Sequence, residues 1–229
     1  MGVLLAEFDA RVQEIELYYS FLRALLADKA DRLTGGSRRV YKISDDLAKI
    51  LKANAYLLLY NLVESSVRDG LTRIYESVHL EGISYDKLCG ELRHIWIEDR
   101  FRPDAARQAE NTAARVIEVI EKVIAAEIVT FDPKRLPISG NIDAAKMREL
   151  AKRYGFSCKT TKRTRGGRAL LDVKSERNSL AHGAKSFSEC GRDATLNSLG
   201  STKAQVILYL RQILRNIESY IAKKQFSTP

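Results

Sequence analysis

The sequence predicts an all-α protein. Good helix formers such as Ala, Leu, Ile, Glu, Lys and Arg dominate its 229 residues, and only four residues are proline. Long stretches repeat apolar side chains at the three- and four-residue spacing of a helix. A chain of this length forms one large domain, or one domain with an insertion, and can bury a substantial core.

The first helix is expected from residue 3 to about residue 33. Its apolar positions keep helical spacing from Leu4 to Leu26, which predicts an apolar face along most of this segment. The run Thr34-Gly35-Gly36-Ser37 is rich in turn-forming residues, so we expect the helix to end there.

A second long helix is expected from Ser44 to about Val78. Ser44 has the side chain of an N-cap, and Asp45 and Asp46 place negative charge in the first turn, where the helix dipole favours it. Residues 55–60 are apolar on every face of this helix, which is typical of a central, buried helix.

The middle of the chain predicts shorter helices. Two are expected at residues 84–99 and 104–128, where apolar positions again keep helical spacing. A loop follows, in which Ser139 or Asn141 is expected to cap a short helix that ends at Tyr154, just before a glycine.

The last part of the chain predicts two helices that complete a bundle. One is expected from about residue 169 to 182, and the other from about 202 to 224, capped by Ser201. With the two long N-terminal helices they suffice for a four-helix bundle, on which residues 84–165 are an elaboration or insertion. We therefore expect residues 1–229 to form a single helical domain.

The net charge and the cysteines indicate which partners and which cellular compartment to expect. The formal net charge is +9, which favours an acidic partner, most commonly nucleic acid. The three cysteines are widely spaced and form no CxxC pair, which favours the cytoplasm over a disulfide framework or a zinc site. We expect no signal peptide, no membrane span, no metal and no cofactor.

One stretch, residues 158–168, is the most basic in the chain and contains two glycines, so we expect a flexible loop. Its position just before the helix at 169–182 makes it a candidate for contacts to the RNA backbone. The alternative is an ordinary solvated run of charge. The candidate residues, called the basic cluster below, are Lys159, Lys162, Arg163, Arg165 and Arg168.

The helix at 169–182 ends in a group of polar residues. Arg177, Asn178 and His182 lie within six residues, and Gly183 follows as a helix-ending residue. Asn178 and His182 are four residues apart and point the same way. Arg177 falls on the apolar stripe of this helix, so its permanent charge needs a partner or a function; alternatively it snorkels beside a capping histidine. The stripe consists of Leu170, Val173, Leu180 and Ala181.

This Arg-x4-His pattern, with Asn directly after the Arg, resembles the motif of the HEPN superfamily of all-helical prokaryotic ribonucleases. Residues 174–183 and 186–189 resemble the branch associated with toxin–antitoxin and phage-defence loci. Further similar segments are Leu59–Glu64 and Ser139–Asp143, so the resemblance runs from about residue 45 onward. It implies a HEPN-like four-helix bundle.

The chemistry of these residues fits RNA cleavage without a metal. A base must remove the proton of the 2′-OH, an acid must protonate the leaving 5′-oxygen, and a cation must stabilise the phosphorane. His182 suits the acid or base role and Arg177 the cation role. One motif supplies one histidine, so we expect a homodimer with both motifs facing each other, as the resemblance also implies.

Two further residues are candidates for the catalytic site. Asn178 either orients the imidazole or binds a phosphate, or else it caps the helix end. Glu64 lies on one face of the second helix with Asn61 and Arg68. It either orients Arg177 or His182 from across the bundle, or forms an ordinary ion pair with Arg68.

The sequence therefore predicts a metal-independent endoribonuclease that acts as a toxin or phage-defence effector. Its partners are expected to be RNA, a second copy of the chain, and an antitoxin or defence-complex protein that holds it in check. The alternative is a non-catalytic HEPN module that binds RNA or another subunit of a defence complex. A purely structural helical protein with a chance motif is the third possibility.

Overall fold

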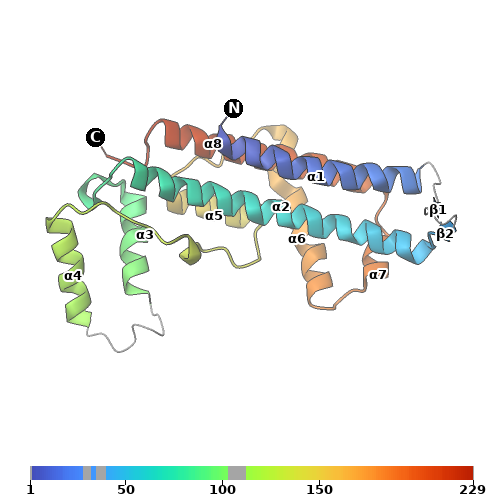
Figure 1. The fold of residues 1–229 in the computed structure, drawn as a ribbon, viewed down its shortest axis with the longest axis horizontal. Helices are drawn as coiled ribbons and strands as arrows, with labels where there is room; N and C mark the ends of the chain where they lie inside the picture. Colours follow the sequence, from blue (N-terminus) through green and yellow to red (C-terminus); the bar gives the residue numbers. More distant parts are fainter. Residues whose placement is uncertain (1, 28–31, 35–39, 103–111, 229) are drawn as a thin grey trace.

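The computed structural model describes residues 2–27, 32–34, 40–102 and 112–228. Three long helices, α1 (Val3–Leu26), α2 (Asp45–Leu80) and α8 (Leu196–Ala222), lie lengthwise beside one another, and α6 (Arg168–Ala181) crosses them (Figure 1). Among the described residues, strands occur only in a short antiparallel hairpin of β1 (Arg32–Thr34) and β2 (Val40–Lys42). The all-α four-helix bundle predicted from the sequence is confirmed.

The first helix is shorter than predicted. It ends at Leu26, where the helical spacing of apolar residues also ends, rather than near residue 33. Residues 32–34 pair with residues 40–42 instead. The hairpin gives their backbone groups hydrogen-bonding partners, and this segment has no apolar face that would pack a helix against the bundle. Most of the predicted terminator, residues 35–37, lies outside the described residues.

The second helix follows the prediction closely. The Ser44 hydroxyl accepts a hydrogen bond from the backbone N–H of Leu47 (3.2 Å), and the helix continues to Leu80. Buried residues occur along most of its length, and it contacts α1, α6, α7 and α8. It is therefore the central helix of the bundle, as its apolar middle section predicted.

The segment between α2 and α6 folds into short elements. Among the described residues they include the 3-10 turn η1 (Tyr85–Lys87), α3 (Gly90–Phe101), α4 (Thr112–Ile124), the 3-10 turn η3 (Pro133–Arg135) and α5 (Ala144–Tyr154). The helix predicted at 84–99 thus begins later, after a turn and an extended Leu88. The helix predicted at 104–128 ends at Ile124, and its first eight residues lie outside the described residues.

Two predicted caps are wrong. Asp143 caps α5, because its carboxylate accepts hydrogen bonds from two backbone N–H groups (2.9 Å each), whereas Ser139 and Asn141 lie in the loop before it. Thr195 caps α8 six residues before the predicted Ser201, because it forms a reciprocal capping box with Ser198. The short helix α7 (Phe187–Arg192), capped by a Ser186–Glu189 box, packs on α2.

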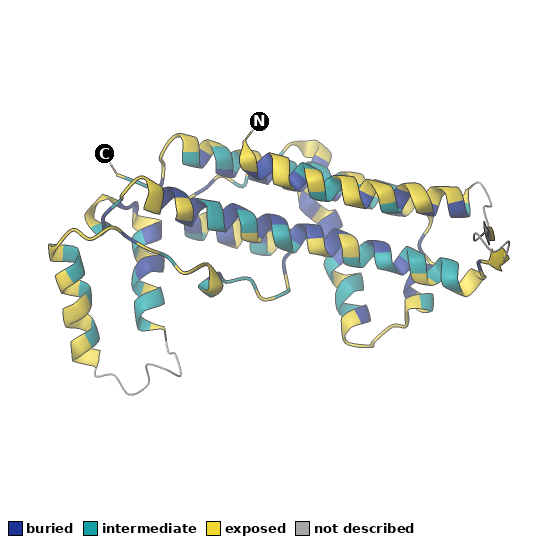
Figure 2. Cartoon of the chain, in the orientation of Figure 1, coloured by how far each residue is buried: buried dark blue, intermediate teal, exposed yellow. Residues whose placement is uncertain are grey.

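Figure 2 shows that buried residues line the facing sides of the long helices and of α6, and that α4 is exposed or half-buried along its length. Within the described residues, no helix combines the length and the apolar character needed to cross a membrane.

Candidate functional site

The motif helix α6 presents Arg177 toward the bundle. Leu170, Val173 and Leu180 are buried on its inner face, whereas Ala181 of the predicted stripe is exposed because the helix ends there. Arg177 lies between Val173 and Leu180 on this face and is half-buried. The sequence therefore placed the charge correctly on the inner side of the helix.

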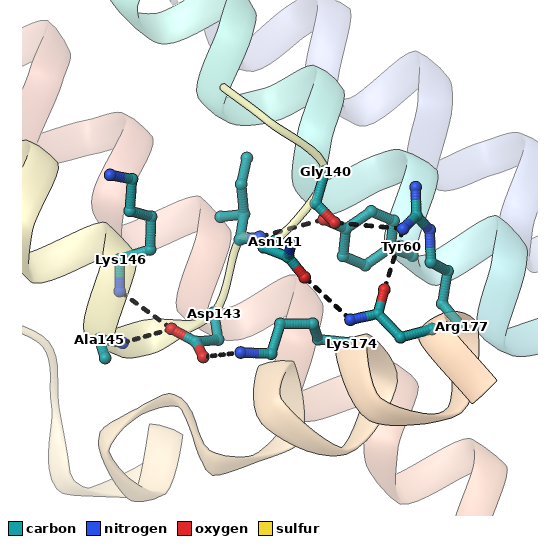
Figure 3. Close-up of polar contacts among 10 residues, drawn as sticks. Tyr60, Gly140, Asn141, Asp143, Ala145, Lys146, Lys174 and Arg177 are labelled. Carbon is teal, nitrogen blue, oxygen red and sulfur yellow. Dashed lines mark hydrogen bonds and ion pairs between the residues drawn. The ribbon is translucent and has the colours of Figure 1, made fainter. Parts of the chain in front are cut away.

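Neutral groups surround the guanidinium group of Arg177 (Figure 3). Its Nη1 atom donates hydrogen bonds to the carbonyl oxygen of Gly140 (3.2 Å) and to Oδ1 of Asn178 (2.9 Å). The guanidinium carbon lies 4.6 Å from the ring centroid of Tyr60 on α2, a cation–π contact. These contacts hold the charge without neutralising it, so it can still attract an anion.

Asn178 links Arg177 to the loop before α5. Its Nδ2 atom donates a hydrogen bond to Oδ1 of Asn141 (2.9 Å), while its Oδ1 atom accepts from Arg177. Its side chain has no hydrogen bond to His182 among the described residues. In this chain the asparagine of the motif therefore contacts the arginine rather than the histidine.

The loop itself is fastened to α2 and α6. The backbone N–H of the buried Ile142 donates to the Tyr60 hydroxyl (3.0 Å), and Lys174 forms an ion pair with Asp143. Burial would raise the pKa of Asp143, but hydrogen bonds from Lys174 and from backbone N–H groups of α5 outweigh it and lower this pKa. Burial, aided by the negative charge of Glu64, raises the pKa of Tyr60.

His182 lies just beyond the last residue of α6 and is exposed. Its backbone N–H closes the helix by donating to the carbonyl oxygen of Asn178 (3.0 Å), and Gly183, with φ +68°, turns the chain away. In the described part of the chain its imidazole has no hydrogen bond or ion pair. It is available to a ligand or to a second subunit.

Glu64 pairs with Arg68 one turn along α2 (3.6 Å), as the simpler of the two interpretations predicted. No hydrogen bond or ion pair connects it to Arg177 or His182 within the described residues. It nevertheless lies one turn from Tyr60, and its charge acts on that side chain. Glu64 therefore borders the cluster around Arg177 without contacting the arginine.

The basic cluster is ordered and lies at the other end of α6. It belongs to the segment η4 (Lys162–Gly167) and its flanks, in which 3-10 turns are interrupted by the left-handed residues Arg165 and Gly166, so the expected loop is a packed segment with local structure. The hydroxyl and backbone N–H of Thr161 bond to Gln212 of α8 (3.0 and 2.7 Å), Thr164 is fully buried, and Gly167 packs in a left-handed conformation against Tyr209. Tertiary packing thus fixes a segment whose composition alone indicated a loop.

All five side chains of the basic cluster are exposed, and none forms an ion pair with another described residue. The 14 residues of α6 span about 20 Å, so the cluster is separated from His182 by roughly that distance along the helix axis. The structure therefore does not bring the predicted RNA-contacting residues next to the motif within one chain.

Tyr60, Gly140 and Asn141 lie around Arg177, and the sequence gave none of them a role in the site; Asn141 was predicted only as a helix cap. All three lie in the segments that carried the resemblance, Leu59–Glu64 and Ser139–Asp143. The Gly-Asn pair signals a turn, and Gly140 adopts the left-handed φ of +71°. Nothing in the sequence, however, indicated that this turn would contact α6.

A family model described as MAE_28990-like HEPN matches residues 2–226 of the chain. The chain belongs to the HEPN superfamily. HEPN membership accounts for the all-α bundle and indicates an RNA-related or defence function, since many HEPN domains are ribonucleases. No curated protein and no solved structure matches this HEPN chain significantly.

Proposed function

We propose that this HEPN protein is a metal-independent endoribonuclease. The observation that carries the proposal is the end of α6, where His182 is exposed and Arg177, five residues earlier, contacts only neutral groups among the described residues. A histidine titrates near neutral pH, and an arginine clamps phosphate oxygens, so the pair suits phosphodiester cleavage.

The reaction needs only groups that RNA and two copies of the motif supply. The 2′-oxygen attacks the adjacent phosphorus as one imidazole takes its proton, and the bond from phosphorus to the 5′-oxygen breaks as a second imidazole donates a proton to it. Arg177 stabilises the charge of the phosphorane. The products are a 2′,3′-cyclic phosphate and a 5′-hydroxyl.

Because one chain provides one motif histidine, the proposal includes an isologous homodimer with the two His182 side chains facing one cleft. The exposed position of His182 at the helix end is compatible with such a cleft. Sedimentation equilibrium tests this part: the expected mass is about twice the 25.8 kDa of one chain. A monomer that still cleaves RNA would refute the shared cleft.

The biological role that we propose is that of a toxin or phage-defence effector in the cytoplasm, restrained by an antitoxin or another defence protein. Glu64 and Asn178 are assigned to the site as neighbours of Tyr60 and Arg177. To restrain the enzyme, such a partner would need only to cover the exposed His182 or to keep the two subunits apart.

The decisive experiment is RNA cleavage by the purified protein in excess EDTA, beside Arg177→Ala and His182→Ala. His79 and His94 are also exposed but belong to other helices, so H79A and H94A are matched controls. We expect wild type to cleave RNA in EDTA and to leave cyclic-phosphate ends. The cleavage rate should fall by at least about 100-fold in both motif variants and should be unchanged in the controls. Unchanged cleavage by R177A and H182A would refute the site.

A non-catalytic RNA-binding role is the second candidate, and the exposed, unpaired basic cluster remote from His182 favours it. Binding of single-stranded RNA is measured with H182A, so that cleavage does not interfere. Each phosphate contact contributes about 0.7 to the steepness with which log K falls with log salt concentration, so replacing the five basic residues with serine should reduce this steepness by about 3.5. No cleavage by wild type, with this salt-sensitive binding, would support the second candidate.

A further inference from the structure

The turn between Gly140 and Asp143 runs beside α6 and bonds to one face of it (Figure 3). Three interactions join them: Lys174 with Asp143, Arg177 with the carbonyl oxygen of Gly140, and Asn178 with Asn141. The three residues of α6 are at positions i, i+3 and i+4, which lie on the same face of a helix. The loop therefore contacts one complete helical turn of α6. A segment outside the four-helix bundle therefore fixes the face that carries the motif arginine.

Hydrogen-bond chemistry fixes the direction of this chain of contacts. The guanidinium group of Arg177 can only donate, so the Asn178 amide must present its oxygen to it. The amide nitrogen then faces away and requires an acceptor, which Oδ1 of Asn141 provides at 2.9 Å. Without that acceptor, the bond from Arg177 is the one contact among the described residues that still holds the amide.

The contacts to Arg177 leave one side of its guanidinium group open. Both bonds use Nη1, whereas Nε and Nη2 have no partner among the described residues and neither nitrogen is buried. These two nitrogens form the side-on fork that matches two oxygens of a phosphate group. The glycine at position 140 permits this arrangement, because a Cβ there would lie 3.3 Å from Nη2.

We infer that Asn141 is a positioning residue for Arg177. Through the Asn178 amide it holds the guanidinium group so that the Nε–Nη2 fork stays open to the scissile phosphate. The inference rests on the proposed ribonuclease activity, but the orientation of Arg177 can be measured without it. Asn141 itself is exposed, so its replacement should not unfold the protein.

The test compares Asn141→Leu, which removes the acceptor, with Asn141→Asp, which keeps it. NMR of the arginine side chains reports directly on Arg177, whose signals are assigned by their loss in Arg177→Lys. In wild type, the two bonds at Nη1 should slow rotation about Nε–Cζ and give separate Nη signals. We expect N141L to merge these signals and N141D to keep them separate.

Cleavage kinetics give the second readout. N141L should lower kcat by about 10- to 100-fold with little change in KM, because the phosphate still binds but is misplaced relative to His182. N141D should restore most of kcat, and Tm should change by no more than about 2 °C in either variant. A merely structural role would lower Tm and leave kcat unchanged, which would overturn the inference.

Two controls separate the possible causes. Asn54→Ala removes an asparagine whose side chain, among the described residues, bonds to the carbonyl oxygen of Ile50 in its own helix and to no other group. Lys174→Ala loosens the turn without removing the acceptor for Asn178. Unchanged Arg177 signals in N141L would refute the positioning role. Absence of cleavage by wild type would refute the proposed function instead, and the NMR comparison would still decide whether Asn141 orients Arg177.

Discussion

Replacing Tyr60 with phenylalanine separates the two contacts that this residue makes. Its hydroxyl accepts a hydrogen bond from the backbone N–H of Ile142 (3.0 Å), whereas its ring lies against Arg177, 4.6 Å from the guanidinium carbon. Y60F removes the first contact and keeps the second. Tyr60 and Ile142 are only 3% and 1% exposed, so water cannot take the place of the lost acceptor.

The expected cost follows from the unsatisfied N–H group. A buried polar group that loses its partner destabilises a protein by about 1–3 kcal/mol. In a chain of this size each kcal/mol lowers Tm by about 2–4 °C, so Y60F should lower Tm by roughly 2–12 °C. Tyr60→Leu should cost more, because it also removes the cation–π contact, worth about 0.5–2 kcal/mol.

Thermal and urea unfolding followed by circular dichroism measure these changes. All variants are compared at one protein concentration, because association between chains would shift the apparent stability. Tyr41→Phe is the control: Tyr41 lies in β2 and is 60% exposed, so its change should stay within about 0.5 kcal/mol. If Y60F cost no more than Y41F, the Ile142 N–H would have another acceptor, and the argument would fail.

Three further predictions concern other parts of the fold. Gly191→Ala should destabilise strongly, because a Cβ at this position of α7 would overlap the carbonyl group of Lys49 in α2; wild-type Tm in this variant would contradict that packing. The lowered pKa of Asp143 means that its stabilising effect is present above about pH 4 and is lost as the pH falls through the lowered value. Urea unfolding should therefore show a stability gap between wild type and Asp143→Asn that closes in acid, and a gap independent of pH would refute this. Burial raises the pKa of the Cys190 thiol to about 12, so iodoacetamide at pH 8 should label the half-buried Cys158 first and Cys190 only on unfolding, as mass spectrometry of digested protein can show.

Local rules predicted the parts of the fold that local interactions determine. Ser44 begins α2 because its own hydroxyl satisfies a free N–H group of the first turn, a relation visible in four consecutive residues. The motif helix was placed to within one residue at each end, because its apolar spacing and the following Gly183 are local features too. The inward position of Arg177 followed from the same spacing.

Competition between similar local signals explains the wrong caps. Ser139, Asn141 and Asp143 are all good N-cap residues, and Asp143 is selected because Tyr60 holds the backbone of Ile142 and Lys174 attracts the carboxylate. Both influences come from distant parts of the chain. The same holds for η4, where contacts with α8 order a segment that glycine and charge content indicated to be loose.

The surroundings of Arg177 were beyond prediction for the same physical reason. They combine a ring from α2, a turn from the insertion and an amide from α6, and no spacing rule relates three segments so far apart. The sequence could identify the chemical groups of the candidate site, and only the fold could show which of them touch.

This arrangement has a consequence for the order in which the protein is made. Arg177 acquires its neighbours only after Tyr60, the Gly140–Asp143 turn and α6 have all docked, and α8, which packs on α1 and α2, is translated later still. Because chains emerge from the ribosome with the N-terminal end first, the elements from α1 to α5 are synthesised before the motif can be assembled. A nascent chain with the activity proposed for it would therefore stay harmless to its own messenger RNA until α6 has been translated and has docked against α2.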